Sequence, residues 1–172
     1  MIAPPPLDGA PASPENRCVI ELRHAASAGE VETVRALFRE YHRWVDEPCC
    51  FAGFEQELAG LPGEYAPPSG RLLLASEAGM PAGCAALRRL DAQTGEMKRL
   101  YVRPAFRGRG LGRQLAEAVI AAAREAGYAC LMLDTLPKMA SAIALYRALA
   151  FAPRGPYAAD PTPGAVFYEL RL

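Results

Sequence analysis

The spacing of apolar and polar residues predicts an amphipathic helix in the first third of the chain. Ser27 and Glu30 have the spacing of a capping box, which places the helix start there. The apolar positions recur every three or four residues; they are Val31, Val34, Phe38, Tyr41 and Val45. The short apolar run before this helix, residues 18–22, predicts a first strand.

The middle of the chain predicts strands. A short helix over residues 51–61 and a proline- and glycine-rich loop over 61–70 come first. Three strand-like runs follow; they are residues 71–76, 82–90 and 95–102. Gly79 and Pro81 suit a turn between the first two runs, so antiparallel pairing is expected.

The last third alternates helices and strands. The predicted order is a helix over 110–126, a strand over 130–134, a helix over 138–150 and two final strands. On the first of these helices one face is apolar; it comprises Leu111, Leu115, Ala118, Val119 and Ala122. The whole pattern favours an α/β fold with one mixed sheet flanked by helices.

Composition indicates one ordinary globular domain. The chain has 172 residues, with 19 basic and 19 acidic side chains, so no net field favours nucleic acid or an anionic membrane as partner. Residues 1–16 are proline-rich and predict a flexible arm before a domain over 17–172. The absence of a leader pattern and of a membrane-length apolar run leads us to expect a cytoplasmic protein.

The cysteines predict neither a disulfide framework nor a metal site. They are odd in number and lack paired ligand spacing; they are Cys18, Cys49, Cys50, Cys84 and Cys130. We expect reduced thiols and no metal.

A glycine-rich loop between a strand and a helix predicts an anion site. The strand end Leu100-Tyr101-Val102 leads into Arg107-Gly108-Arg109-Gly110-Leu111-Gly112, where the apolar helix begins. Free amides at a helix start attract phosphate, and Arg107, Arg109 and Arg113 add positive charge there. A P-loop would need Gly-Lys followed by Ser or Thr, and a dinucleotide fingerprint would need glycine at Arg113. The alternative is a tight turn without a ligand.

The remaining pattern, R-x-x-G-x-G at Arg107, Gly110 and Gly112, resembles the GNAT superfamily of N-acetyltransferases. The similarity covers roughly residues 19–172. Its further marks are Leu100-Tyr101-Val102 followed by Pro104, Leu131-Met132-Leu133, and Ala142-x-x-Leu145-Tyr146. It implies a three-layer arrangement, with about six to seven strands and about four helices. Met139 replaces the usual asparagine, and Ala150 replaces a glycine that matters only if the backbone there needs a positive φ.

The resemblance implies acetyl-CoA as co-substrate, without a metal. The phosphates would lie on residues 107–113. The pantetheine arm would lie where two strands separate, bonded to the backbone of Leu100, Tyr101 and Val102 like an added strand. The acceptor would be a primary amine of a small molecule or peptide, attacking directly in a ternary complex.

The resemblance also implies two catalytic residues. Glu96 is the candidate base, and strict alternation along its strand puts it on one face with Lys98, Leu100 and Val102. Tyr146 is the candidate acid for the departing thiolate, although on reference pKa values that transfer is uphill by about 2 kcal/mol. The alternatives are a surface charge beside Lys98 and a packed core tyrosine.

Other functions remain open from the sequence. A non-catalytic coenzyme A-binding sensor or partner-binding domain is one alternative, and transfer through a cysteine is a mechanistic one. Further side chains are candidates for acceptor contact; they are His42, Trp44, Asp46, Glu47, Glu64, Tyr65, Tyr157 and Asp160. A homodimer is possible on general grounds.

Overall fold

The computed structural model describes residues 20–46, 53–158 and 161–172. The predicted arm over residues 1–16 and the start of the predicted first strand lie outside this part. In the described ranges, no helix has both the length and the apolarity needed to cross a membrane.

The described strands form one mixed sheet of seven strands, in the order β1-β2-β3-β4-β5-β7-β6. Their bounds are β1 Ile20–His24, β2 Arg71–Glu77, β3 Met80–Arg89, β4 Thr94–Val102, β5 Cys130–Thr135, β6 Ala152–Arg154 and β7 Val166–Arg171. β4 and β5 pair in parallel, and the other neighbours pair antiparallel. The expected strands and antiparallel hairpins are confirmed.

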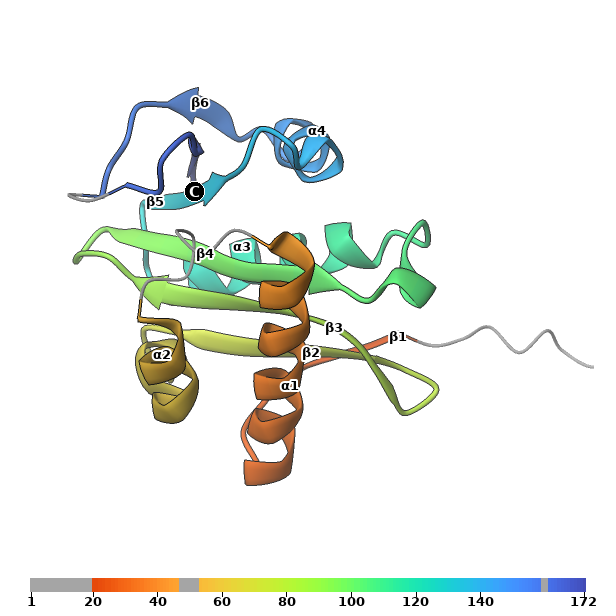
Figure 1. Ribbon diagram of the computed structural model, residues 1–172. Coiled ribbons are helices and arrows are strands. Elements are labelled where there is room, and N and C mark those ends of the chain that lie inside the picture. Colours follow the sequence, from red (N-terminus) through yellow and green to blue (C-terminus); the bar gives the residue numbers. More distant parts are fainter. Residues whose placement is uncertain (1–19, 47–52, 159–160) are drawn as a thin grey trace, which may run out of the picture.

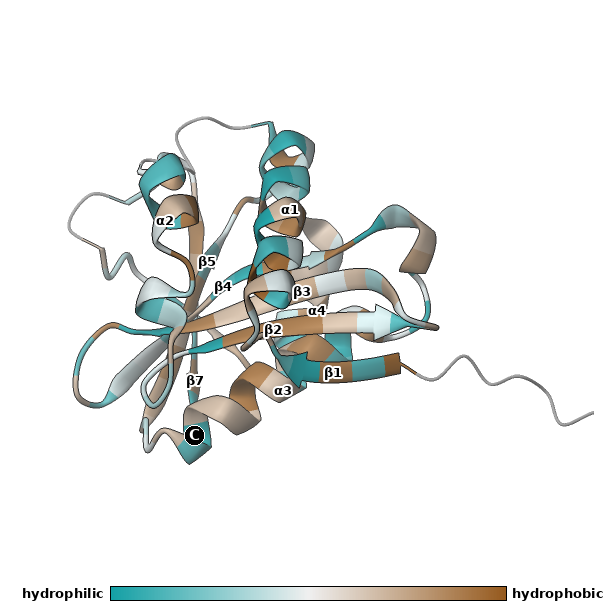
Figure 2. Cartoon of the chain, turned by 90° about the horizontal axis from the view of Figure 1, so that it is seen from below, coloured by the Kyte–Doolittle hydropathy of each residue, from teal (hydrophilic) through white to brown (hydrophobic). Residues whose placement is uncertain are grey.

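Helices cover both faces of the sheet, as the three-layer expectation required. The α-helices of the described residues are α1 Ala28–Val45, α2 Phe54–Gly60, α3 Leu111–Glu125 and α4 Ala140–Ala148, and two 3-10 turns are η2 Gly63–Tyr65 and η3 Pro104–Phe106. α1 and α2 lie on one side and α3 on the other (Figures 1 and 2). α4 packs on the α3 side, through side chains that include Tyr146 and Leu145. The fold class is confirmed.

The capping box forms at the start of α1. The Glu30 amide donates to Ser27 Oγ at 3.3 Å, and the Ser27 amide donates to Glu30 Oε2 at 3.0 Å. The predicted apolar face is buried against the sheet at Val31, Val34 and Phe38. Side-chain capping therefore sets where α1 begins, and its apolar stripe sets how it packs.

A bulge in β4 overturns the strict alternation expected along this strand. Arg99 has a φ of 57°, and the pairing of β3 with β4 shifts register between Cys84 and Ala86. After the extra residue, Leu100 and Val102 pack with Met97 on the α3 side, while Tyr101 is buried on the α1 side. Glu96 therefore does not share a face with Leu100 and Val102, because a bulge reverses the side-chain order.

Ala150 does adopt a positive φ, of 65°. It follows the C-terminus of α4, where the Phe151 amide donates to the Tyr146 carbonyl and the Ala150 amide donates to the Arg147 carbonyl. These two bonds form a Schellman motif, whose left-handed position usually holds glycine. Alanine at this position keeps the turn that the family pattern implies.

Candidate active site

The sheet forks between β4 and β5. The two strands pair only at Thr94 with Cys130, Gly95 with Leu131 and Glu96 with Met132. Beyond Glu96, β4 continues to Val102 without a β5 partner, and a cleft opens between the strands. The cleft is lined by Tyr41, Val45, Met97, Lys98, Arg99, Leu100, Asp134, Thr135, Leu136, Met139, Ala142 and Tyr146. The strand separation expected from the resemblance is confirmed.

The glycine loop lies beside the end of this fork. Gly108 and Gly110 have φ values of 77° and 80°, which only glycine adopts without strain, and α3 begins directly after them. A Cβ on Gly112 would meet Val102 on β4 and Leu145 on α4, each at 3.8 Å. The amides of the first turn of α3 thus lie where β4, α3 and α4 meet, and they have no acceptor within the helix.

The three arginines of the loop are exposed and already have protein partners. Arg109 Nη1 lies 2.7 Å from Glu77 Oε2, and Arg113 Nη1 lies 3.1 Å from Glu117 Oε1. The guanidinium of Arg107 stacks 4.6 Å from the ring of Trp44, and its Nε donates to the Val102 carbonyl at 2.9 Å. A phosphate at this loop would therefore compete with existing contacts of the arginines, whereas the amides of α3 are preorganised.

Of the three residues expected to bond the pantetheine arm, Leu100 lines the cleft directly. Tyr101 turns its ring to the α1 side, 5.7 Å from the ring of Tyr41. The Val102 carbonyl already accepts the bond from Arg107. The free edge of β4 is therefore available chiefly before Val102.

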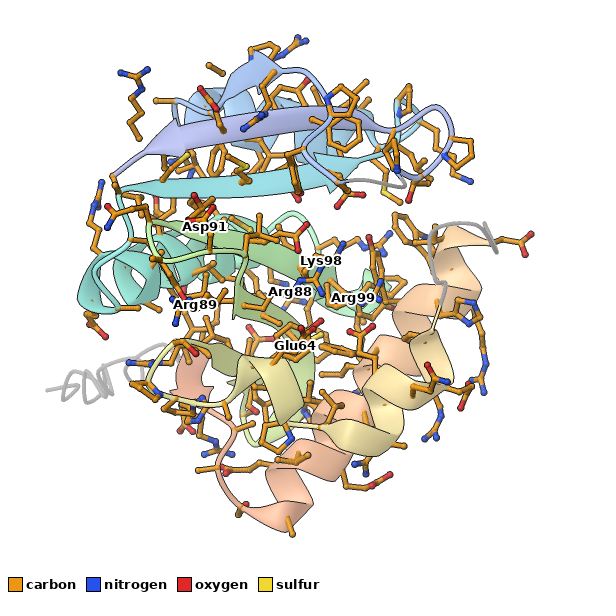
Figure 3. All side chains as sticks on the ribbon, turned by 90° about the vertical axis from the view of Figure 1, so that its left-hand side faces the viewer. Glu64, Arg88, Arg89, Asp91, Lys98 and Arg99 are labelled. Carbon is orange, nitrogen blue, oxygen red and sulfur yellow. The ribbon has the colours of Figure 1, made fainter. Side chains whose placement is uncertain are left out.

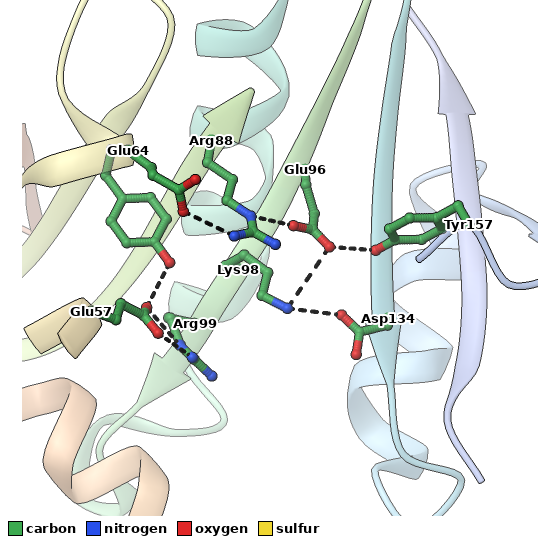
Figure 4. A network of polar contacts seen from close by, with 9 residues as sticks. Glu57, Glu64, Arg88, Glu96, Lys98, Arg99, Asp134 and Tyr157 are labelled. Carbon is green, nitrogen blue, oxygen red and sulfur yellow. Dashed lines mark hydrogen bonds and ion pairs between the residues drawn. The ribbon is translucent and has the colours of Figure 1, made fainter. Parts of the chain in front are cut away.

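Glu96 is not a surface charge. Its side chain is 3% exposed, and Arg88 Nε donates to its Oε2 at 2.5 Å. The hydroxyl of Tyr157 donates to its Oε1 at 2.6 Å, and Lys98 Nζ lies 3.8 Å from the same oxygen (Figure 4). Burial and the nearby Glu96 carboxylate raise the pKa of Tyr157. Glu96 is thus a buried carboxylate that is held by three neighbours and does not line the cleft.

The contacts of Glu96 continue on both sides as a polar network. Arg88 also reaches Glu64 Oε2 at 2.9 Å, and Lys98 reaches Asp134 Oδ1 at 3.1 Å. Figure 3 shows Glu64, Arg88, Lys98 and Arg99 gathered together, with Asp91 toward the β3–β4 turn. The network joins η2, three strands of the sheet and the cleft.

Tyr146 is the residue predicted to act as the acid for the departing thiolate. It lines the cleft from α4 with 6% exposure, against the rings of Phe151 and Tyr168. Burial, with lesser effects of Tyr41 and Asp134, raises its pKa. Among the described residues, none hydrogen-bonds its hydroxyl, which leaves that group available to a ligand. The raised pKa favours a hydrogen-bond donor over a full proton donor.

The cysteines within the described residues are poor nucleophiles. Cys84 is completely buried, and burial raises its pKa. Burial also raises the pKa of Cys130. Since the thiolate is the reactive form, neither favours transfer through cysteine. Cys18, Cys49 and Cys50 lie outside the described residues.

Five of the eight acceptor-side candidates separate into three groups. Tyr157 contacts Glu96, and Glu64 contacts Arg88, so both join the network. Tyr65 donates to Glu57, which pairs with Arg99. Glu47 and Asp160 lie outside the described residues. The prediction from the sequence missed Arg88 and Asp134. Asp134 follows Met132 by two residues on β5, just as Lys98 follows Glu96 by two residues on the neighbouring β4.

No group of metal-binding side chains occurs within residues 20–46, 53–158 and 161–172. The residues of the site instead suit an extended ligand with phosphates at one end. The loop supplies amides and arginines, the fork supplies a free strand edge, and Tyr146 stands beside that edge.

Known proteins resemble this chain in sequence and in fold. An uncharacterised N-acetyltransferase of Schizosaccharomyces pombe is 34% identical over 145 residues, which cover 83% of this chain and 89% of that protein. An acetyltransferase from Streptococcus agalactiae has a TM-score of 0.75 at 21% identity, covering 89% of this chain and 98% of its own. An acetyltransferase from Salmonella typhimurium, solved with acetyl-CoA, has a TM-score of 0.66 at 21% identity, covering 89% and 94%.

The family itself is also matched directly. A sequence model described as the acetyltransferase (GNAT) family matches residues 31–151, which include the fork, the glycine loop and Tyr146. The chain therefore belongs to the GNAT family of acetyltransferases.

Proposed function

We propose that this chain is an acetyl-CoA-dependent N-acetyltransferase that acts on a primary amine of a small molecule or peptide. The observation that carries the proposal is the fork between β4 and β5, which opens beside both the start of α3 and the hydroxyl of Tyr146. Acetyl-CoA in the Salmonella typhimurium relative supports the choice of co-substrate.

The residues would hold the co-substrate at two places. The first-turn amides of α3 would bind the diphosphate, helped by the helix dipole. The free edge of β4 around Leu100 would bond the amides of the pantetheine arm, because an unpaired strand edge accepts an added strand. When bound, acetyl-CoA would supply the thioester carbon that the amine attacks.

Transfer would be direct. The neutral amine nitrogen forms a bond to the thioester carbon, the carbon–sulfur bond breaks, and the thiolate of coenzyme A departs while the nitrogen loses a proton. Tyr146 would donate a hydrogen bond to the departing sulfur. Glu96 would receive the proton indirectly, since its oxygens lie behind Lys98 and Tyr157 and not in the cleft. Holding both reactants together can lower the barrier by roughly 7–11 kcal/mol.

The test is release of free coenzyme A thiol from acetyl-CoA, measured with a panel of amines. We expect thiol release to depend on both the protein and one class of amine, with formation of the matching N-acetyl product by mass spectrometry. Binding of coenzyme A without amine-dependent turnover would instead support the sensor or partner-binding function.

A further inference from the structure

The side chains of Lys98 and Asp134 bridge the fork at the point where backbone pairing ends. The last paired residues are Glu96 and Met132, and Lys98 and Asp134 each stand two residues further along their strands. Lys98 Nζ lies 3.1 Å from Asp134 Oδ1 across the gap (Figure 4). This ion pair therefore lies at the inner end of the cleft, and both of its side chains line the cleft wall.

Asp134 is the carboxylate of the network that a ligand in the cleft can reach. Its side chain is 23% exposed, whereas that of Glu96 is 3% exposed. Both oxygens of Glu96 have donors, but only Oδ1 of Asp134 has one among the described residues. The Oδ2 oxygen of Asp134 can accept a hydrogen bond from a ligand.

The formal charge of the network favours a cationic ligand. Its three carboxylates, Glu64, Glu96 and Asp134, face two cations, Arg88 and Lys98. One negative charge is therefore left over among the described members. An ammonium group beside Asp134 would balance it in a partly buried place, where charge pairing is stronger than in water.

Apart from Arg99, which pairs with Glu57, the wall on the α1 side of the cleft is apolar. Tyr41, Val45, Leu136 and Met139 line it, and all four pack with the buried cluster under α1. The opposite wall contains Tyr146 and Leu100 and leads to the glycine loop, where the proposed co-substrate enters. An acceptor that enters on the α1 side would place its body against apolar side chains.

We propose that Asp134 binds the ammonium group of the acceptor and that the acceptor is a monoamine with an apolar body. This inference rests on the proposed acetyl transfer. A polyamine would place a second charge against the apolar wall, and an amino acid would place its carboxylate beside Asp134. Both arrangements cost free energy, so the site discriminates against both classes.

The experiment compares 2-phenylethylamine, spermidine and aspartate as acceptors, with thiol release as readout. We expect kcat/KM for 2-phenylethylamine to exceed the other two by at least about tenfold, which corresponds to about 1.4 kcal/mol. Equal or better turnover of spermidine or aspartate would overturn the assignment of the acceptor class and leave the proposed transfer intact. Failure of every amine, with coenzyme A still bound, would refute the transfer itself and this inference with it.

The matched variants are Asp134→Asn and Asp91→Asn. The amide oxygen of the new side chain in Asp134→Asn can still accept the bond from Lys98, so the fork should remain closed at its inner end. We expect Asp134→Asn to raise the KM for the amine at least about tenfold, with coenzyme A affinity unchanged by calorimetry. Asp134→Glu should recover part of the loss, and Asp91→Asn, on the exposed β3–β4 turn, should change neither quantity. An unchanged amine KM in folded Asp134→Asn would refute the role of Asp134.

Discussion

At the scale of single residues, Ala150 holds a backbone conformation that suits glycine better. Its φ of 65° lies in the left-handed region. Its backbone amide donates a hydrogen bond to the Arg147 carbonyl, which helps to end α4. We predict that Ala150→Gly stabilises the protein by about 0.5–1 kcal/mol, because relief of strain exceeds the added entropy of the unfolded chain. The midpoint and slope of urea unfolding would measure this.

The control for this prediction is Ala144→Gly, in the exposed middle of α4. Glycine inside a helix costs roughly 0.5–1 kcal/mol, so this variant should be destabilised. Equal effects of the two substitutions would contradict the strain argument.

A substitution of Tyr146 tests the proposed chemistry at the same scale. Its hydroxyl lines the cleft without a hydrogen bond from the described residues, so Tyr146→Phe should cost little stability. We predict a fall in kcat of at least about tenfold with unchanged affinity for coenzyme A, since the lost donor acts on the departing sulfur. Single-turnover kinetics would measure the chemical step, and unchanged rates would make Tyr146 a packing residue.

Single residues also show why the sequence predicted the site only in part. The glycine loop and Tyr146 follow from local patterns and from the resemblance. The surroundings of Glu96 do not, because Arg88 and Tyr157 reach it from other strands and loops. The prediction of strict alternation along β4 failed at Arg99, because a bulge there moves every later side chain to the other face of the sheet. No residue type in this part of the sequence indicates the bulge.

At the scale of elements, the sequence predicted the order of strands and helices well, since apolar spacing and caps are local. It contained less information on which elements are linked by polar contacts. Glu57 on α2 accepts from Arg99 Nε at 3.0 Å and from the Tyr65 hydroxyl at 2.6 Å. This contact ties α2 to the bulge of β4, next to the cleft.

The link between α2 and β4 predicts a pH dependence of stability. Burial alone would raise the pKa of Glu57, but the hydrogen bonds and charge of Arg99, with Tyr65, outweigh it and lower the pKa below 4.5. A lowered native pKa stabilises the folded state above the unfolded pKa, and this contribution is lost as pH falls through the native value. Glu57→Gln should therefore cost about 1–3 kcal/mol at pH 7 and less at pH 3.

Urea unfolding at several pH values between 7 and about 3 would measure this difference. Glu55→Gln provides the control, because Glu55 is exposed on the same helix. It should change stability little at any pH. A loss that stays constant with pH in Glu57→Gln would contradict the assigned pKa direction.

At the scale of the whole molecule, the sheet consists of two parts that meet at a short parallel pairing. β1 to β4 form one part, β5 to β7 form the other, and three residue pairs of β4 and β5 join them. Figure 1 shows α4, β5 and β6 on one side of this junction, with α1 and α2 on the other. Only the resemblance predicted where the junction would open.

A ligand that fills the fork should therefore stabilise the entire fold. We predict that acetyl-CoA at about 100 times its Kd raises the free energy of unfolding by about 2.7 kcal/mol, through binding to the native state alone. Binding should also change the fluorescence of Trp44, the single tryptophan, because phosphate at the loop would draw Arg107 from its ring. Thermal unfolding and fluorescence titration would measure the two effects.

Gly112→Ala separates ligand binding from folding in this experiment. The new Cβ would meet Val102 and Leu145 at 3.8 Å, an ordinary contact distance, so the unliganded protein should remain as stable as the parent. The same methyl group stands between β4 and α4, at the start of α3 where the diphosphate would approach the amides. Acetyl-CoA should therefore stabilise this variant less and bind at least about tenfold more weakly, whereas equal stabilisation of both proteins would place the co-substrate elsewhere.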